Sequence, residues 1–177
     1  RGDFKPYIQV SIDNGNTWKS ISSNLPDKGT VYDIVEDHID PDLLFVGTEF
    51  GVYFTIDGGK EWKQLKAGLP TIAVKDLEIQ KRENDLVLAT FGRSFYVLDD
   101  YSALRSIKNN ISAKSHIFPV KDAIMYIDAR PLGLRGKGSQ GESHYTAENP
   151  PIGAVFTYLF NDTLKSKQDI RQEKEKK

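Results

Sequence analysis

Two short glycine-containing turns hold the residues best suited to binding chemistry, Glu49 and Phe50 in the first, Phe91 and Arg93 in the second. Arg93 could bind a carboxylate or stack on a sugar, with either phenylalanine as an apolar platform. Glu49 could be one half of the carboxylate pair that glycoside cleavage requires, its partner lying outside this chain. A salt bridge to a neighbouring part of the fold would explain Arg93 or Glu49 equally well, and the sequence leaves both interpretations open.

A second group of polar residues lies in "EDHIDPD" at 36–42. Histidine with several carboxylates is a combination that binds metal ions, and here it comprises Asp37, His38, Asp40 and Asp42. A polar turn beside a proline would explain the same residues without a metal ion. The "DNGN" at 13–16 lacks the further acidic residues of a twelve-residue calcium loop. We therefore predict no metal site and no cofactor.

The clearest pattern is a repeated octet, "SIDNGNTW" at 11–18 and "TIDGGKEW" at 55–62, spaced by 44 residues. The aspartate can accept hydrogen bonds from backbone N–H groups of the turn, glycine can adopt positive φ, and the tryptophan ring can anchor the turn. All these roles are structural. The residues that we assign to them are Ser11, Asp13, Gly15 and Trp18, and then Thr55, Asp57, Gly59 and Trp62.

The match extends around the octets with a period of 42 to 44 residues, which is typical of propeller blades. Between the turns run short segments rich in Val, Ile, Phe and Tyr, as strands are. We expect the second unit to contain four strands, near 31–37, 43–49, 51–57 and 61–66. The third unit should contain three strands, near 74–80, 85–91 and 94–100, and a weak fourth strand after Tyr101. Residues 5–22 hold the outer two strands of a first unit, and no helical stripe is expected before residue 161.

Runs such as "LLFVG" and "VYFTI" are apolar on both faces, as expected for a sheet between two neighbouring sheets. The predicted fold class is all-β, a partial β-propeller of about two and a half four-stranded blades. A loop, a strand and a C-terminal helical tail follow it. Propellers usually close with four to eight blades, so the remaining blades are expected in a longer protein.

"SIDNGNTW" resembles the Asp-box, the turn repeated in sialidases, xyloglucan-cleaving glycosidases and sortilin-type receptors. With "GTEFGVYFTIDGG", "ATFGRSFYVLDD" and "ENPPIGAVFTYL", the chain resembles the C-terminal part of bacterial sortilin-like, Asp-box (BNR) repeat proteins. The third unit keeps Asp99 and has lost the glycine and the tryptophan, and "FGRS" lacks the histidine that the resembled proteins often have there. The resemblance implies a secreted or periplasmic protein, although the sequence itself leaves the localisation unknown.

In the resembled propellers the Asp-box joins the third strand to the fourth, away from the ligand. The turns between second and third strands then lie at the opposite end of the sheets. This places Glu49, Phe50, Phe91 and Arg93 on the expected ligand face.

The pattern changes after the blades. We predict propeller blades over 1–112, a strand segment over 113–130 and a flexible Gly-rich loop over 131–149. Residues 150–177 would form a strand and a charged helix, capped by Asp162 or Thr163, at the start of a further domain.

Bulk composition narrows the function classes. The formal net charge of −1 gives no field that favours nucleic acid, and no apolar run is long enough to span a membrane. The absence of cysteine excludes disulfides and thiolate sites. No phosphate-cradling glycine loop and no GxSxG motif occur. Because the chain opens on Arg1 without a signal-peptide pattern, we expect it to be part of something longer.

Three functions remain open. The first is a propeller module that binds a glycan, peptide or protein on the face with Phe50 and Arg93. The second is part of a xyloglucanase-like glycoside hydrolase, with the catalytic acids mainly in upstream blades. The third is a scaffold that presents the downstream segment to a partner. The sequence favours the first.

Overall fold

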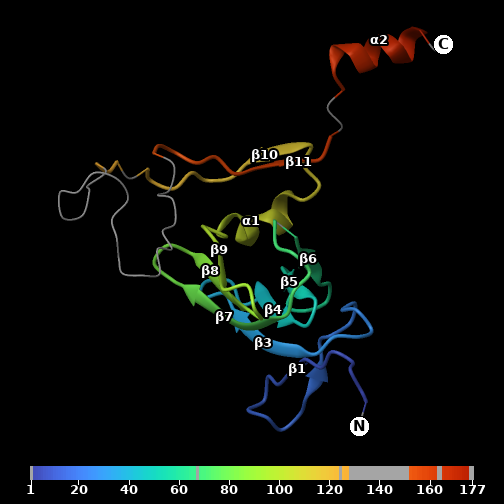
Figure 1. The fold of residues 1–177 in the computed structure, drawn as a ribbon, viewed down its shortest axis with the longest axis vertical. Coiled ribbons are helices and arrows are strands. Elements are labelled where there is room, and N and C mark those ends of the chain that lie inside the picture. Colours follow the sequence, from blue (N-terminus) through green and yellow to red (C-terminus); the bar gives the residue numbers. More distant parts are fainter. Residues whose placement is uncertain (1, 67, 124, 128–151, 163–164, 176–177) are drawn as a thin grey trace. The chain divides into compact units, whose positions relative to one another are not determined.

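The computed structural model describes residues 2–66, 68–123, 125–127, 152–162 and 165–175 (Figure 1). The chain divides into two compact units, Arg1–Ala113 and Lys114–Lys177. The loop that we predict over 131–149 lies outside the described residues.

The first unit is built from antiparallel strands in chain order. A two-stranded sheet comes first, then a four-stranded sheet and a three-stranded sheet, and each strand pairs with its neighbour in the chain. The strands are β1 (Gln9–Val10), β2 (Lys19–Ser20), β3 (Val31–Glu36), β4 (Leu44–Thr48), β5 (Gly51–Thr55), β6 (Lys63–Leu65), β7 (Val74–Gln80), β8 (Asp85–Thr90) and β9 (Phe95–Leu98). The predicted fold class is confirmed: the unit is mainly β, and its sheets follow one another like blades of a partial propeller.

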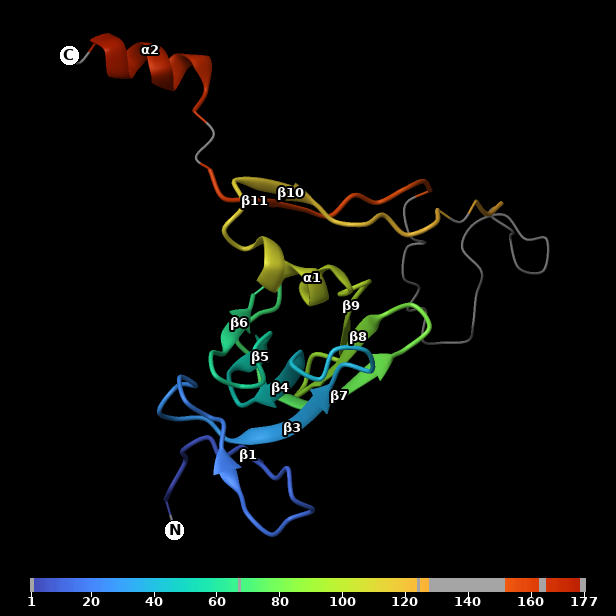
Figure 2. The ribbon, with the colours of Figure 1, turned by 180° about the vertical axis from the view of Figure 1, so that it is seen from behind.

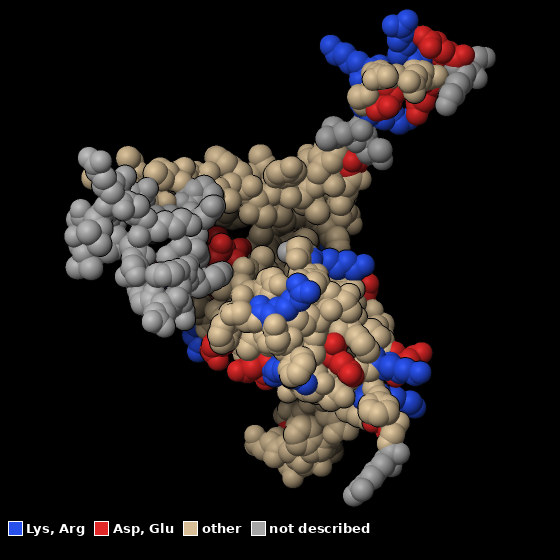
Figure 3. Space-filling view, viewed as in Figure 1, with Lys and Arg blue, Asp and Glu red and all other residues tan. Residues whose placement is uncertain are grey.

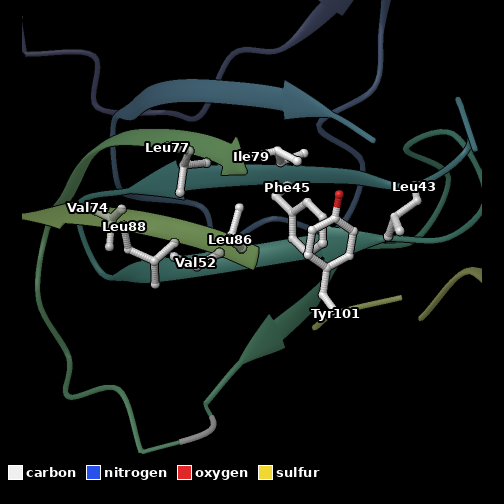
Figure 4. Close-up of a cluster of buried hydrophobic side chains, with 9 residues drawn as sticks. All are labelled: Leu43, Phe45, Val52, Val74, Leu77, Ile79, Leu86, Leu88 and Tyr101. Atoms are coloured by element: carbon white, nitrogen blue, oxygen red, sulfur yellow. The ribbon is translucent and has the colours of Figure 1, made fainter. Parts of the chain in front are cut away.

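The middle strands of the four-stranded sheet, β4 and β5, are buried on both faces, as their continuous apolar runs predict. Along β4, Phe45 packs with Val52 and with the three-stranded sheet, whereas Val46 packs with Trp62 and Ile8 on the other face. Figure 4 shows the first cluster, in which the Phe45 ring lies edge-on to Tyr101 with centroids 5.0 Å apart. Most of the core therefore lies between successive sheets.

β3 and β7, the first strands of their sheets, lie side by side in both ribbon views (Figure 2). The Leu77 N–H donates to the Asp33 carboxylate at 2.8 Å, which joins the two sheets directly. Gly47 on β4 permits the close approach, since a Cβ there would come within 2.8 Å of the Val74 carbonyl oxygen. A side chain at residue 47 would push the sheets apart.

Helix α1 (Ala103–Asn110) stands where the sequence led us to expect a fourth strand after Tyr101. That expectation was wrong, as was the expectation of no helix before residue 161. The third unit has lost the glycine and tryptophan of the octet, so no hairpin turn forms after β9. Instead, Tyr101 and Leu104 pack on the core while Arg105 reaches across to Asp37.

In the second unit, β10 (Ser115–Ile117) pairs antiparallel with β11 (Tyr158–Phe160), and the charged tail forms α2 (Lys167–Glu175). The predicted cap was wrong. Asp162 lies before the helix, and Thr163 is outside the described residues. Ser166 caps α2 instead, because its Oγ accepts from the Asp169 N–H at 3.1 Å while the Asp169 carboxylate accepts from the Ser166 N–H at 2.9 Å.

Charged side chains of both signs alternate over the visible face of the first unit, without a large patch of one sign (Figure 3). This distribution fits the near-zero net charge. None of the helices in the described ranges is long and apolar enough to cross a membrane.

Candidate ligand-binding face

The candidate residues lie at one end of two neighbouring sheets. The strand register pairs Val31 with Thr48 and Val74 with Thr90, so each first strand begins beside the turn that links its second and third strands. Glu49 and Phe50 occupy the first of these turns, and Phe91 and Arg93 the second. This end of the first unit, carrying the β4–β5 and β8–β9 turns, is called the turn face below.

Equivalent threonines fix the two turns. The Thr48 hydroxyl donates to the Gly51 carbonyl at 2.9 Å and accepts from the Phe50 N–H at 3.2 Å. The Thr90 hydroxyl donates to the Ser94 carbonyl at 2.6 Å. Gly92 and Ser94 adopt positive φ, which glycine tolerates and serine rarely does. The backbone that carries the candidate side chains is thus held by hydrogen bonds within each turn.

Phe91 is the most exposed aromatic residue of the turn face, at 71% of its full area. The Lys75 ammonium lies 5.8 Å from the centre of the Phe91 ring and 3.4 Å from that of Tyr32. Both distances are within the range of a cation–π interaction. The face therefore carries a positive charge between two aromatic rings, one on each sheet.

The other three candidates are less tightly grouped. The Phe50 ring, 41% exposed, packs against Gly29 of the preceding link. Glu49 is half-buried, its N–H donating to the Thr30 carbonyl at 3.0 Å, and Arg93 is exposed. Within the described part of the chain Glu49 and Arg93 form no ion pair with each other, nor does either have a salt-bridge partner elsewhere. The structure brings Phe91 together with Lys75 and Tyr32 and leaves Glu49 separate from Arg93.

Sequence reasoning missed Tyr32 and Lys75. They occupy the same position in successive repeats, directly after Val31 and Val74, at a bulge near the start of β3 and of β7. The repeat alignment contains this correspondence. What it lacks is the contact, which depends on two first strands that are distant in sequence lying side by side.

The two octets lie at the opposite end of the sheets, and their aspartates bind the turn. Asp13 accepts from the Thr17 N–H at 2.8 Å and from the Thr17 hydroxyl at 2.6 Å, and the Ser11 hydroxyl accepts from the Gly15 N–H at 2.7 Å. Hydrogen bonds from Thr17 and then from Ser11 lower the pKa of the Asp13 carboxyl to about 2.

The second octet repeats this arrangement. Asp57 accepts from the Lys60 and Glu61 N–H groups, each at 3.0 Å, and Thr55 accepts from the Gly59 N–H at 3.1 Å. Burial on its own raises the pKa of Asp57. The hydrogen bond that the Thr55 hydroxyl donates to it at 2.6 Å, with those from the Glu61 and Lys60 N–H groups, outweighs burial, and the pKa falls below its usual value. The Asp57 carboxylate is thereby used in holding the turn itself.

Trp62 of this octet is 3% exposed and donates from Nε1 to the Ile21 carbonyl at 2.6 Å, whereas Trp18 is 61% exposed and donates to Gly15 of its own turn at 3.0 Å. The two equivalent tryptophans thus differ in what covers them. The link after β2 covers Trp62 within the first unit.

The acidic cluster at 37–42 forms a structural anchor. Asp37 is buried and accepts from Arg105 Nε at 2.8 Å, from Arg105 Nη2 at 2.7 Å and from the Tyr101 hydroxyl at 2.6 Å. Burial favours a raised pKa for this carboxyl, but the hydrogen bonds from Arg105 and Tyr101 hold its pKa well below the usual range. Lys108 neutralises Asp40 and Asp42, at 3.3 Å from each. In the described ranges no group of three or more acidic or histidine residues is arranged to hold a metal ion.

A shallow hollow of about 310 Å³ lies between α1 and the second octet. It is lined by the apolar residues Phe54, Ile56 and Ile111 and by charged residues of both signs. Lys108 among them is already paired with Asp42. The hollow therefore offers no group aimed at a ligand of one sign.

Comparison with known proteins leaves the family undefined. No protein-family model matches the chain, and no curated protein matches it. Among solved structures, an ancestral GH74 enzyme aligns with a TM-score of 0.44 and 14% sequence identity. The alignment covers 55% of this chain and 16% of the enzyme, so the matched part is a small fraction of that protein.

Proposed function

We propose that the first unit is part of an Asp-box propeller whose turn face binds a glycan. The observation that carries the proposal is the exposed Phe91 ring, held beside Lys75 and Tyr32 on a face whose backbone is fixed by threonine hydrogen bonds. The flat apolar faces of sugar rings stack on exposed aromatic rings, and charged groups at the edge bond to hydroxyl or carboxylate oxygens.

The hydrogen bonding of the two octets supports the Asp-box part of the proposal. In both, an aspartate accepts N–H groups three or four residues further on and the preceding hydroxyl residue bonds the glycine N–H. Because these bonds hold the turns, we assign Asp13 and Asp57 a structural role. Contacts with a ligand are then made at the other end of the sheets. A full propeller would include further blades, and a secreted or periplasmic location follows from the resemblance.

Binding to a panel of polysaccharides, xyloglucan included, tests the proposal. We expect retention on at least one polymer, lost in Phe91→Ala and weakened in Arg93→Ala. Trp18→Ala is the matched control, since it removes an exposed aromatic ring at the opposite end of the sheets. The assignment of this face would be overturned if the unaltered protein were retained on no polymer. It would also be overturned if Trp18→Ala lost retention as fully as Phe91→Ala.

The same incubations distinguish binding from cleavage. Release of new reducing ends would make the protein a glycoside hydrolase, and Glu49→Gln would then test whether this carboxylate takes part. Retention without new reducing ends supports the binding module.

A further inference from the structure

We propose that the turn face selects acidic glycans, through a uronate carboxylate bound by Lys75 and Arg93 while the sugar ring stacks on Phe91. This inference rests on the proposed glycan-binding function and adds the class of sugar.

The position of the Lys75 charge is the first argument. A lysine ammonium is normally a mobile, strongly hydrated charge on a flexible stem. Here it lies 3.4 Å from the centre of the Tyr32 ring and 5.8 Å from that of Phe91, so two rings from neighbouring sheets restrict it. Lys75 is nevertheless exposed, so its charge is open to an anion that reaches this face.

The second argument is the absence of a counter-ion. Among the ion pairs of the described residues, none involves Lys75 or Arg93, whereas Lys108 and Arg105 in the same unit are paired with carboxylates. Arg93 stands two residues from Phe91 in one turn, and its guanidinium can bind a carboxylate through two parallel hydrogen bonds. Glu49, half-buried on the neighbouring turn, pairs with neither cation within the described residues.

The third argument separates a sugar from a peptide. A peptide bound by strand addition would take its hydrogen bonds from the edge of a sheet. The groups that this face exposes include a phenylalanine ring at 71% and two cations, which fit a flat ring bearing a carboxylate. In a uronate the acid group projects from the edge of the sugar ring, so stacking and ion pairing can occur together.

The test compares oligogalacturonides with the same oligomers after complete methyl esterification, by calorimetry at low salt with this chain. The ester keeps the ring and removes the charge. We expect the acid to bind about tenfold more tightly than the ester, a difference of about 1.4 kcal/mol. Lys75→Gln should weaken binding of the acid more than binding of the ester and so lower this preference, and Phe91→Ala should abolish both. Added salt should weaken binding of the acid alone.

Lys75→Met is a second variant, which removes the charge but keeps the apolar length of the side chain beside Tyr32. It therefore separates loss of the charge from loss of packing. Lys81→Gln, at the exposed loop between β7 and β8, removes one positive charge elsewhere and should leave the preference intact. Equal affinity for acid and ester, or an equal loss in Lys81→Gln, would overturn the inference while the proposed function stands. No binding of either oligomer, together with no retention on any polymer of the panel, would overturn both.

Discussion

Asp37 and Arg105 lie 68 residues apart in the chain and meet through both carboxylate oxygens, at 2.8 Å to Nε and 2.7 Å to Nη2. The pair ties the loop between β3 and β4 to helix α1, and the Tyr101 hydroxyl adds a third bond at 2.6 Å. Arg105 also donates to the Asn84 side chain at 2.7 Å. The helix is therefore held by polar bonds on one side and by Leu104 in the core on the other.

Arg105→Met should destabilise the first unit by about 3 to 5 kcal/mol, because it leaves a buried carboxylate without its counter-ion. Both tryptophans lie in this unit, so urea unfolding followed by tryptophan fluorescence measures the change. Arg82→Met is the control, since Arg82 is exposed and pairs with the adjacent Glu83, and a change within about 0.5 kcal/mol is expected. A similar loss in both variants would show that the pair contributes nothing specific.

Acid should destabilise the same unit. The pKa values of Asp13, Asp37 and Asp57 are lowered in the folded state, that of Asp13 to about 2. The unfolded chain, with aspartate pKa values of about 3.9, then binds more protons than the folded chain below about pH 5. The free energy of unfolding should be level from pH 7 to about pH 5 and should fall as the pH is lowered to 3.

Urea titrations at pH 7, 5, 4 and 3 measure this dependence. In Asp37→Asn the fall between pH 5 and pH 3 should be smaller than in the unaltered chain, since one of the three groups no longer titrates. A free energy of unfolding that rises as the pH is lowered would contradict the role of these carboxylates.

Much of the blade architecture could be predicted from the sequence because local signals agreed. The octets mark the third-to-fourth turns, and apolar runs between them, such as that of β4, give the strands to within a few residues. The contacts of Lys75 with Tyr32 and of Arg105 with Asp37 could not be predicted from the sequence, because each joins elements that only the packing of the sheets brings together. Helix α1 was missed because the repeat favoured a strand there.

Asp33 offers a test of how the sheets are joined. Its carboxylate accepts a hydrogen bond from the Leu77 N–H at 2.8 Å, across the two sheets. Asp76 occupies the equivalent position of the next repeat and is adjacent to Leu77 in the chain, and its carboxylate accepts from the same N–H at 3.1 Å. Asp33→Ala should cost about 1 to 2 kcal/mol in the free energy of unfolding, since the bond across the sheets is lost. Asp76→Ala should cost less than about 0.5 kcal/mol. If the two substitutions changed the free energy of unfolding equally, the hydrogen bond between the sheets would make no specific contribution to stability.

The two octet tryptophans should differ sharply when each is replaced by alanine. Trp62→Ala removes a ring that is 3% exposed and packs with Leu25 and Val46, and it leaves the Ile21 carbonyl without the bond from Nε1. A loss of about 3 to 5 kcal/mol is expected, as for other large side chains removed from a core. Trp18→Ala removes a ring that is 61% exposed, so its cost should stay below about 1 kcal/mol. Far-UV circular dichroism during urea unfolding compares the two without depending on tryptophan fluorescence. Equal losses would mean that Trp18 is covered in solution, and that the first octet has a partner surface in this chain as the second has at Ile21.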